Sequence, residues 1–365
     1  MPHDRLLTTT IGAYPKPGCT PIGDWFPDPD DTEAGARGEG LLKRWQRADY
    51  EQQLAEAGES AEAAFVAAIE EVVRDQVAAG IDIPTDGEVR RENYIFYQCR
   101  NLNGVDFEHL TEKVARDGAF TARVPTITGP VTPRDLVLAR DWRIAQRVTD
   151  RPVKITLPGP MTITDSLANT FYPDPGAQGR ALAEALNAEV RSLAAAGCRH
   201  IQVDEPVFAR KPEPALDYGI ENLERVFHGV PEGVQRIVHM CCGYPSALDN
   251  PDYPKADPQA YFQLAHAMDE AAIDAVSIED AHRPNDLSLL ERYTRTTVLF
   301  GVVNIGRSRV EPVEEIAERL GRALEHIDPA RLVAAPDCGL GLLGRDLAVA
   351  KMTNLCTAAH GVGCG

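Results

Sequence analysis

A histidine and a cysteine stand two residues apart in the stretch Arg236-Ile-Val-His239-Met-Cys241-Cys242-Gly243, which begins as an apolar run and ends in a loop signal. Side chains two residues apart in a strand point to the same face, so His239 and Cys241 can converge on one metal ion. Imidazole and thiolate together are ligands that zinc prefers. An isolated pair of this kind is a weak signal, so the prediction of a metal site depends on further ligands elsewhere in the chain.

The elements that must position such ligands alternate regularly along the chain. Apolar, β-branched runs predict strands over residues 6–11, 81–85, 153–157, 200–204, 236–243, 275–279, 298–303 and 332–337. Helical periodicity predicts helices near residues 51–79, 135–147, 179–196, 313–326 and 347–360. Eight strands alternating with helices predict an α/β protein with one domain over residues 1–365, a single (β/α)8 TIM barrel. An open doubly wound sheet is the alternative, but the sequence has neither its dinucleotide-binding fingerprint nor a P-loop.

Two segments interrupt this alternation. Residues 17–40 are rich in Pro, Gly and Asp and predict an N-terminal excursion. Residues 94–132 lack the regular pattern and predict a β extension through residues 124–128, between the second and third strands.

The residues that end the predicted strands complete the ligand set. In a barrel of this kind, catalytic residues lie at the C-terminal ends of the strands, where Glu279 and Cys338 join His239 and Cys241. Any one of these cysteines alone would more often be a small buried hydrophobic residue. Two thiolates, one imidazole and one carboxylate at separate strand ends instead predict a tetrahedral Zn²⁺ site.

This ligand set also indicates the chemistry of the site. Two thiolates and a carboxylate make the site electron-rich, which suits binding a substrate thiol and keeping it deprotonated better than activating water. Glu279 is the hardest of the four ligands and is the one that a substrate sulfur would displace. The residues therefore predict a zinc-dependent transfer of an alkyl group to a thiol.

Composition excludes several other classes of protein. The chain has 365 residues and a net charge of −18, which argues against binding to nucleic acid and to anionic membranes. No apolar run approaches the length that spans a bilayer, and the first residues lack the apolar core of a signal peptide, so we expect a cytoplasmic protein. Eight cysteines without a secretion signal predict free thiols and metal ligands rather than disulfides.

Seven stretches together resemble a known family. They are Thr10-Ile-Gly-Ala-Tyr-Pro15, Asp86-Gly-Glu-Val-Arg-Arg-Glu-Asn93, Leu157-Pro-Gly-Pro-Met-Thr162, Ile201-Gln-Val-Asp-Glu-Pro206, His239-Met-Cys241, Val276-Ser-Ile-Glu279 and Pro336-Asp-Cys-Gly-Leu340. Over most of its length the chain resembles the C-terminal catalytic barrel of cobalamin-independent methionine synthase, without room for that family's additional N-terminal barrel. The resemblance implies zinc bound by His239, Cys241, Glu279 and Cys338. It also implies that Glu88 and Asp204 contact the amino group of homocysteine, and that Ile11, Gly12 and Ala13 receive its carboxylate. Ala13 stands where the family usually has serine.

Two departures from the family pattern concern the methyl donor. Ser166 stands where the family has an aromatic platform for the folate pterin, and Gly306 stands where it has a proton-donating histidine. His282 is the candidate replacement for that acid, and Tyr14 or Phe171 for the stacking group. We therefore expect a methylcorrinoid, free or on a corrinoid protein, or a methyl-folate bound in an altered way, ahead of the usual polyglutamyl folate.

The predicted reaction is methyl transfer to homocysteine, giving methionine. One alternative is alkylation of a different thiol, as in epoxyalkane:coenzyme M transferase. A sulfonate thiol has no amino group and would gain nothing from the carboxylates of Glu88 and Asp204, so these residues favour homocysteine. A second alternative is a non-catalytic barrel with a structural zinc site.

Overall fold

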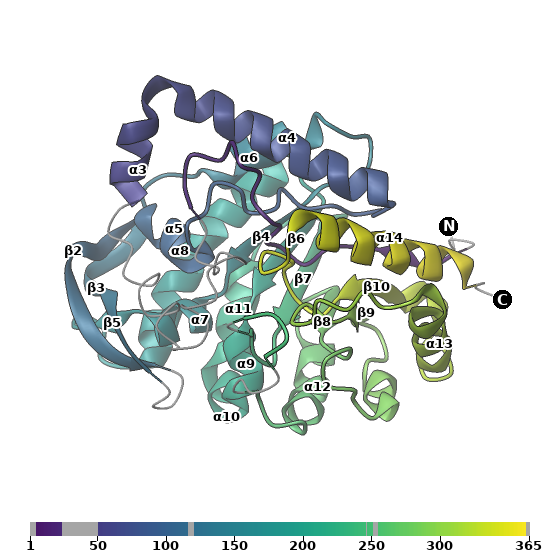
Figure 1. The fold of residues 1–365 in the computed structure, drawn as a ribbon. Coiled ribbons are helices and arrows are strands. Elements are labelled where there is room, and N and C mark those ends of the chain that lie inside the picture. Colours follow the sequence, from purple (N-terminus) through teal and green to yellow (C-terminus); the bar gives the residue numbers. More distant parts are fainter. Residues whose placement is uncertain (1–4, 24–49, 116–119, 246, 251–254, 363–365) are drawn as a thin grey trace.

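The computed structural model describes residues 5–23, 50–115, 120–245, 247–250 and 255–362. A seven-stranded parallel sheet in the order β1-β10-β9-β8-β7-β6-β4 forms its centre (Figure 1). The strands are β1 (Leu7–Thr8), β4 (Lys154–Pro158), β6 (His200–Asp204), β7 (Gln235–Met240), β8 (Ala275–Ile278), β9 (Thr297–Val303) and β10 (Leu332–Pro336). The α/β fold predicted from the sequence is confirmed.

The second predicted strand, residues 81–85, is not a regular strand in the structure. It makes isolated parallel bridges to both edges of the sheet, from Ile83 to Thr9 beside β1 and from Thr85 to Lys154 in β4. Between them, Pro84 has no N–H and cannot extend the ladder, although its carbonyl accepts a hydrogen bond from Lys154 N at 2.8 Å. The segment thus links the two edge strands without forming a full ladder.

Helices surround the sheet; the longer ones lie close to predicted positions except for the helix over residues 260–270, and most of the shorter ones were not predicted. The longer ones are α3 (Tyr50–Ala57), α4 (Ala61–Ala79), α6 (Leu138–Gln146), α8 (Pro175–Ala196), α12 (Ala260–Glu270), α13 (Val313–Ala323) and α14 (Arg345–Gly361). Shorter ones are α5 (Tyr94–Arg100), α7 (Pro160–Ser166), α9 (Pro206–Arg210), α10 (Pro212–Pro214), α11 (Ile220–Val226), η1 (Gly58–Ser60), η3 (Ala215–Gly219), η4 (Leu287–Arg292) and η5 (Pro329–Arg331). The single helix predicted over residues 51–79 is divided at Gly58, which adopts a positive φ of 54°.

The strands separate two sets of buried side chains, because successive side chains point to opposite faces. Ile155, Ile201 and Val238 belong to the large apolar core that packs against the helices. A second, smaller apolar cluster lies on the opposite face, toward the inside of the curved sheet: Ile11, Ile237, Ala275, Leu299, Val333 and Ala335. On β4 and β6 the inner face is polar instead, with Lys154, Thr156, Gln202 and Asp204. The inside of the sheet is therefore apolar on one side and polar on the other.

A β extension lies between residues 81–85 and β4, as the sequence predicted. It pairs β2 (Leu102–Ala115) antiparallel with β3 (Phe120–Pro133), and β3 with β5 (Ala168–Asn169), at the left of Figure 1. Its two long strands exceed the predicted residues 124–128. Most of the predicted N-terminal excursion falls on residues 24–49, which lie outside the described residues. One of the eight cysteines, Cys364, also lies outside them. Within the described part of the chain, no helix has the length and apolar character needed to cross a membrane.

Candidate active site

His239 lies near the end of β7 with both ring nitrogens engaged. Nδ1 is 2.9 Å from Ser277 Oγ on the neighbouring strand, and Nε2 is 3.3 Å from Cys338 Sγ. Burial, with a smaller effect from the Lys154 amine, lowers the pKa of His239 to about 3. Burial thus favours the neutral ring, and in the tautomer whose Nδ1–H donates to Ser277 the Nε2 lone pair is available to a metal.

The Cys338 thiol next to that nitrogen also lies beside Cys241, and Cys241 lies beside the Glu279 carboxylate. Cys338 Sγ is 3.9 Å from Cys241 Sγ, and Cys241 Sγ is 3.3 Å from Glu279 Oε1. With zinc bonds of about 2.3 Å to sulfur and 2.0 Å to nitrogen or oxygen, tetrahedral edges measure about 3.8 Å between sulfurs and about 3.5 Å otherwise. These three separations match the corresponding edges, so His239, Cys241 and Cys338 fit a zinc ion, and Glu279 lies next to Cys241 as the candidate fourth ligand.

The charges of the site also fit a cation. A hydrogen bond with Cys338, together with burial, raises the pKa of the Cys241 thiol well above its usual value. Burial, together with Cys241 and Asp337, raises the pKa of Glu279 in the same way. These acids resist ionisation next to one another unless a positive charge compensates them. A bound divalent cation would supply that charge and deprotonate the thiols.

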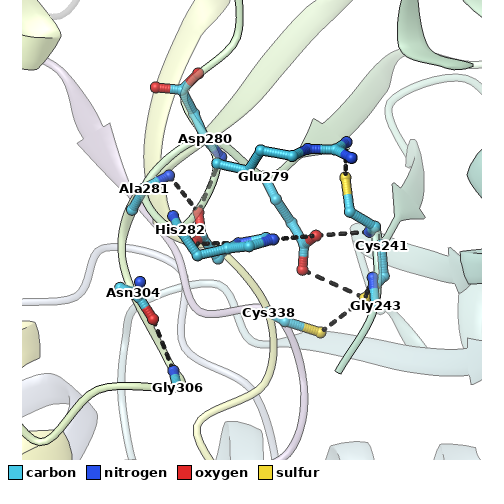
Figure 2. Close-up of polar contacts among 12 residues, drawn as sticks. Cys241, Gly243, Glu279, Asp280, Ala281, His282, Asn304, Gly306 and Cys338 are labelled. Atoms are coloured by element: carbon cyan, nitrogen blue, oxygen red, sulfur yellow. Dashed lines mark hydrogen bonds and ion pairs between the residues drawn. The ribbon is translucent and has the colours of Figure 1, made fainter. Parts of the chain in front are cut away.

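The Glu279 carboxylate lies beside one group of ligand-type atoms and belongs to a second. One group is His239, Cys241 and Cys338, whose ligand atoms lie within 4.8 Å of one another, and the other is Cys242, Glu279 and His282. Figure 2 shows the Glu279 carboxylate between the His282 ring and Cys241, with Oε2 accepting a 2.6 Å hydrogen bond from Cys242 N. The carboxylate therefore has hydrogen-bonding partners outside the three-residue metal group.

His282 is held by a buried carboxylate. Asp337 Oδ2 is 2.8 Å from His282 Nδ1 and accepts the backbone N–H of the same residue at 2.8 Å. Asp337 Oδ1 accepts the backbone N–H groups of Asp280 and Ala281, both at 2.9 Å. This fixes the ring so that Nε2 lies 3.6 Å from Glu279 Oε2. His282 thus lies next to the proposed metal ligands, and its hydrogen bond to Asp337 sets the orientation of its ring.

Glu88 approaches the same region from a tight turn. Gly87 and Glu88 both have positive φ, 68° and 58°, which is unusual for a glutamate and marks backbone strain of the kind that accumulates at functional sites. Glu88 Oε1 accepts a 2.6 Å hydrogen bond from Thr156 Oγ1 and lies 3.3 Å from Arg91 Nη1. A Cβ on Gly12 would lie 2.6 Å from the same oxygen, so Gly12 allows the loop to pass against Glu88.

Asp204 ends β6 close to that loop. Gln202 Nε2 donates to both Asp204 Oδ1 at 2.7 Å and the Ile11 carbonyl at 2.8 Å. The Ala13 carbonyl accepts from Leu340 N at 2.7 Å, which anchors the loop to the segment after Cys338. Burial and the neighbouring Glu88 carboxylate raise the pKa of Asp204 well above its usual value. Two neighbouring carboxylates repel each other when both are ionised, and a positively charged ligand would relieve that repulsion.

Other residues considered from the sequence are placed differently. The Tyr14 hydroxyl is bound to Asp75, and the ring is 1% exposed within the core, so it offers no free face for stacking. Phe171 is 48% exposed, in the loop after β5. Ser166 Oγ donates to the Thr162 carbonyl within α7. A Cβ on Gly306 would meet the Pro245 ring at 3.1 Å, so a side chain there would require Pro245 to shift.

The structure adds residues that the sequence did not single out. Arg91 and Thr156 hold Glu88, Gln202 holds Asp204, Ser277 holds His239, and Asp337 holds His282. Strand alternation was the available signal for three of them: Thr156, Gln202 and Ser277 share an inner face with residues already identified.

Comparisons with known proteins identify the family to which the chain belongs. The model of the cobalamin-independent synthase catalytic domain matches residues 40–361. The methionine synthases of Sulfolobus acidocaldarius and Saccharolobus solfataricus are each 29% identical, over 96% of this chain and 90% and 92% of the relatives. The structure of a B12-independent methionine synthase from Shewanella sp. W3-18-1, in complex with selenomethionine, superposes with a TM-score of 0.82 at 29% identity over 97% of both chains. A putative vitamin-B12-independent methionine synthase from Listeria monocytogenes shares the fold, with a TM-score of 0.66 at 19% identity. The resemblance predicted from the sequence is confirmed: the chain belongs to the cobalamin-independent methionine synthase family.

Proposed function

We propose that this protein is a zinc-dependent S-methyltransferase that transfers a methyl group to the thiol of homocysteine and releases methionine. The observation that carries this proposal is that His239, Cys241 and Cys338, with Glu279 beside Cys241, lie at the same end of the sheet as the Glu88 and Asp204 carboxylates. The names of the relatives, methionine synthases, support the same reaction. We also propose that residues 81–85 act as the eighth strand of one closed barrel, because they bridge both sheet edges.

His239, Cys241 and Cys338 would hold the zinc ion, with Glu279 as the fourth ligand in the absence of substrate. Bound zinc would lower the pKa of a substrate thiol and keep it a nucleophilic thiolate near neutral pH. Glu279 is the ligand suited to exchange, because Cys242 N donates to its Oε2 at 2.6 Å and can hold the carboxylate when it leaves.

Glu88 and Asp204 would bind the ammonium group of homocysteine, and the loop of Ile11, Gly12 and Ala13 would receive its carboxylate. The loop lies against Glu88 at Gly12 and is tied to Asp204 through Gln202, so the two parts of the subsite are adjacent. A thiol with a sulfonate in place of the amino-acid end would bring no positive charge to these carboxylates. The structure therefore favours homocysteine over coenzyme M as the acceptor.

For the methyl donor, we propose a methyl-folate bound without the usual platform. The family and the Shewanella relative are described as independent of cobalamin or B12, and nothing in the comparisons supports a corrinoid partner. A folate nitrogen leaves poorly unless it is protonated, so an acid is needed. We assign that role to His282, whose Nδ1 is fixed by Asp337 and whose other nitrogen faces the site.

The test supplies purified, zinc-loaded protein with homocysteine and one donor at a time: methyl-tetrahydropteroyl-monoglutamate, its triglutamate, or methylcobalamin. Formation of methionine is followed by mass spectrometry, with coenzyme M replacing homocysteine in a parallel series. We expect methionine from a methyl-folate and no methylated coenzyme M. Turnover only with methylcobalamin would refute the donor assignment, and absence of methionine with every donor would refute the function.

A further inference from the structure

Gln202 connects the two parts of the proposed amino-acid subsite. Its amide has two N–H groups, and the structure uses Nε2 to donate to the Ile11 carbonyl and to Asp204 Oδ1. Ile11 and Gln202 are 191 residues apart in the sequence. One side chain thereby sets the position of the loop proposed to receive the substrate carboxylate and of the acid proposed to bind its ammonium.

Because Nε2 makes both of these hydrogen bonds, the orientation of the amide oxygen Oε1 is also fixed. Gln202 is completely buried, and its Oε1 has no hydrogen-bond partner among the described residues. A buried carbonyl oxygen without a partner is unfavourable, so a donor is expected near it.

Lys154 is placed to supply that donor. It is completely buried, and its Nζ likewise has no hydrogen-bond partner within the described part of the chain. In the register of β4 and β6, Thr156 pairs with Gln202 and Lys154 pairs with His200, so Lys154 and Gln202 are diagonal neighbours on the same inner face. A lysine side chain can span the separation between such neighbours.

Electrostatic effects on nearby groups agree with this placement of the amine. Lys154 lowers the pKa of both His200 and His239, after burial, and it favours ionisation of Asp204. These directions agree with the inner-face position that the register of β4 and β6 gives to Lys154. Burial lowers the pKa of Lys154 itself to about 7, but either protonation state has N–H groups to donate.

We propose that Gln202 and Lys154 are positioning residues for the amino-acid end of the substrate: Lys154 donates to Gln202 Oε1 through one bridging water, since the two atoms are not directly hydrogen-bonded, and so fixes the amide that holds Ile11 and Asp204. This inference rests on the proposed function, because it concerns the same subsite. It predicts that the two residues affect ligands with an amino-acid end and leave simple thiols and zinc unaffected.

The experiment measures binding by calorimetry to zinc-loaded wild type, Gln202→Met, Gln202→Asn and Lys154→Met, with L-homocysteine, L-methionine and 1-propanethiol. The Asn variant keeps an amide but shortens its reach, which guards against misfolding of the Met variant. Gln178→Met, a buried glutamine on the outer helix α8, is the matched control. Zinc content and thermal melting are recorded for each protein.

We expect the Gln202 variants to bind both amino acids at least about tenfold more weakly, and Lys154→Met about three- to tenfold more weakly, from the loss of one or two charge-assisted hydrogen bonds. Binding of 1-propanethiol, zinc content and the control should match wild type. Equal weakening of 1-propanethiol, loss of zinc, or unchanged amino-acid binding would overturn the inference. Wild type that binds 1-propanethiol but neither amino acid would instead refute the proposed function.

Discussion

Replacing Glu88 by glutamine tests the proposed ammonium subsite most directly, because it removes one negative charge and keeps the shape of the side chain. In the native protein, Glu88 Oε1 accepts from Thr156 at 2.6 Å and lies 3.3 Å from Arg91. The glutamine carbonyl can still accept from Thr156. Arg91 loses the charge of Glu88 but keeps Asp86 as an anionic partner at 3.5 Å, and the contact to the substrate ammonium becomes a hydrogen bond to a neutral group.

The magnitude follows from the difference between the two kinds of hydrogen bond. A bond to a charged group contributes about 1.5–3 kcal/mol and a neutral one about 0.5–1.5 kcal/mol, so the loss is roughly 1–1.5 kcal/mol. Part of this loss is offset, because Glu88 raises the pKa of Asp204 and its removal makes Asp204 easier to ionise. We expect the homocysteine KM to rise about five- to fifteenfold, since 1.4 kcal/mol corresponds to a factor of ten.

The pH dependence gives a second readout. Asp204 must be ionised to hold an ammonium, so homocysteine binding strengthens as the pH rises through the pKa of Asp204. Removing the Glu88 charge lowers that pKa, and the strengthening should move to lower pH in Glu88→Gln.

Glu92→Gln is the matched control, because this buried glutamate of the same loop pairs with Arg100 at 2.8 Å instead. Steady-state kinetics with homocysteine and calorimetry with 1-propanethiol would be measured for both variants. An unchanged homocysteine KM in Glu88→Gln, or an equal rise in the control, would show that the subsite is misassigned.

Three further predictions address the metal, the acid and the fold. Cys338→Ser should lose most of its zinc, measured by metal analysis, and full retention of zinc and activity would contradict the ligand assignment. His282→Gln should lower kcat with a methyl-folate donor by about 10²–10⁴-fold while methionine binding measured by calorimetry stays unchanged. Burial opposes ionisation of Asp269, but hydrogen bonds from Thr294 and Thr296 outweigh it and hold its pKa well below the usual value. Asp269→Asn should therefore lower the free energy of unfolding by about 1.5–3 kcal/mol at pH 7, a difference that shrinks as the pH falls below about 4 in denaturant titrations.

The sequence predicted most of the framework because strand ends and helix ends carry local signals. Gly80 ends α4 with a φ of 107°, as a glycine after an apolar periodic run indicates. The segments around His239, Cys241, Glu279 and Cys338 were identified because polar residues directly follow apolar runs. Their ligand roles remain predictions, while their proximity is a feature of the structure.

Other features depend on contacts that no local pattern specifies. Residues 81–85 have the composition of a strand, yet Pro84 limits them to isolated bridges. These bridges join the segment to Thr9 beside β1 and to Lys154 in β4, which are far apart in the sequence. Glu88 pairs with Arg91 from a turn in which Gly87 and Glu88 both have positive φ. The sequence Gly-Glu does not by itself predict a positive φ at the glutamate. Departures from a family pattern, such as Gly306, indicated a change at the donor side without indicating what replaces it.

The polar inner face of β4 and β6 explains why this end of the sheet can serve an amino-acid substrate. An all-apolar interior would fill the space below the site with side chains that cannot hold Asp204 or the Ile11 carbonyl. Here Gln202 makes both contacts from a fully buried position, and Thr156 on the adjacent strand holds Glu88 in the same way. Because each acid is fixed from below by a neutral donor, its remaining oxygen can face the substrate. The binding groups are therefore prepared by the interior of the fold, whereas the zinc ligands are prepared by the ends of its strands.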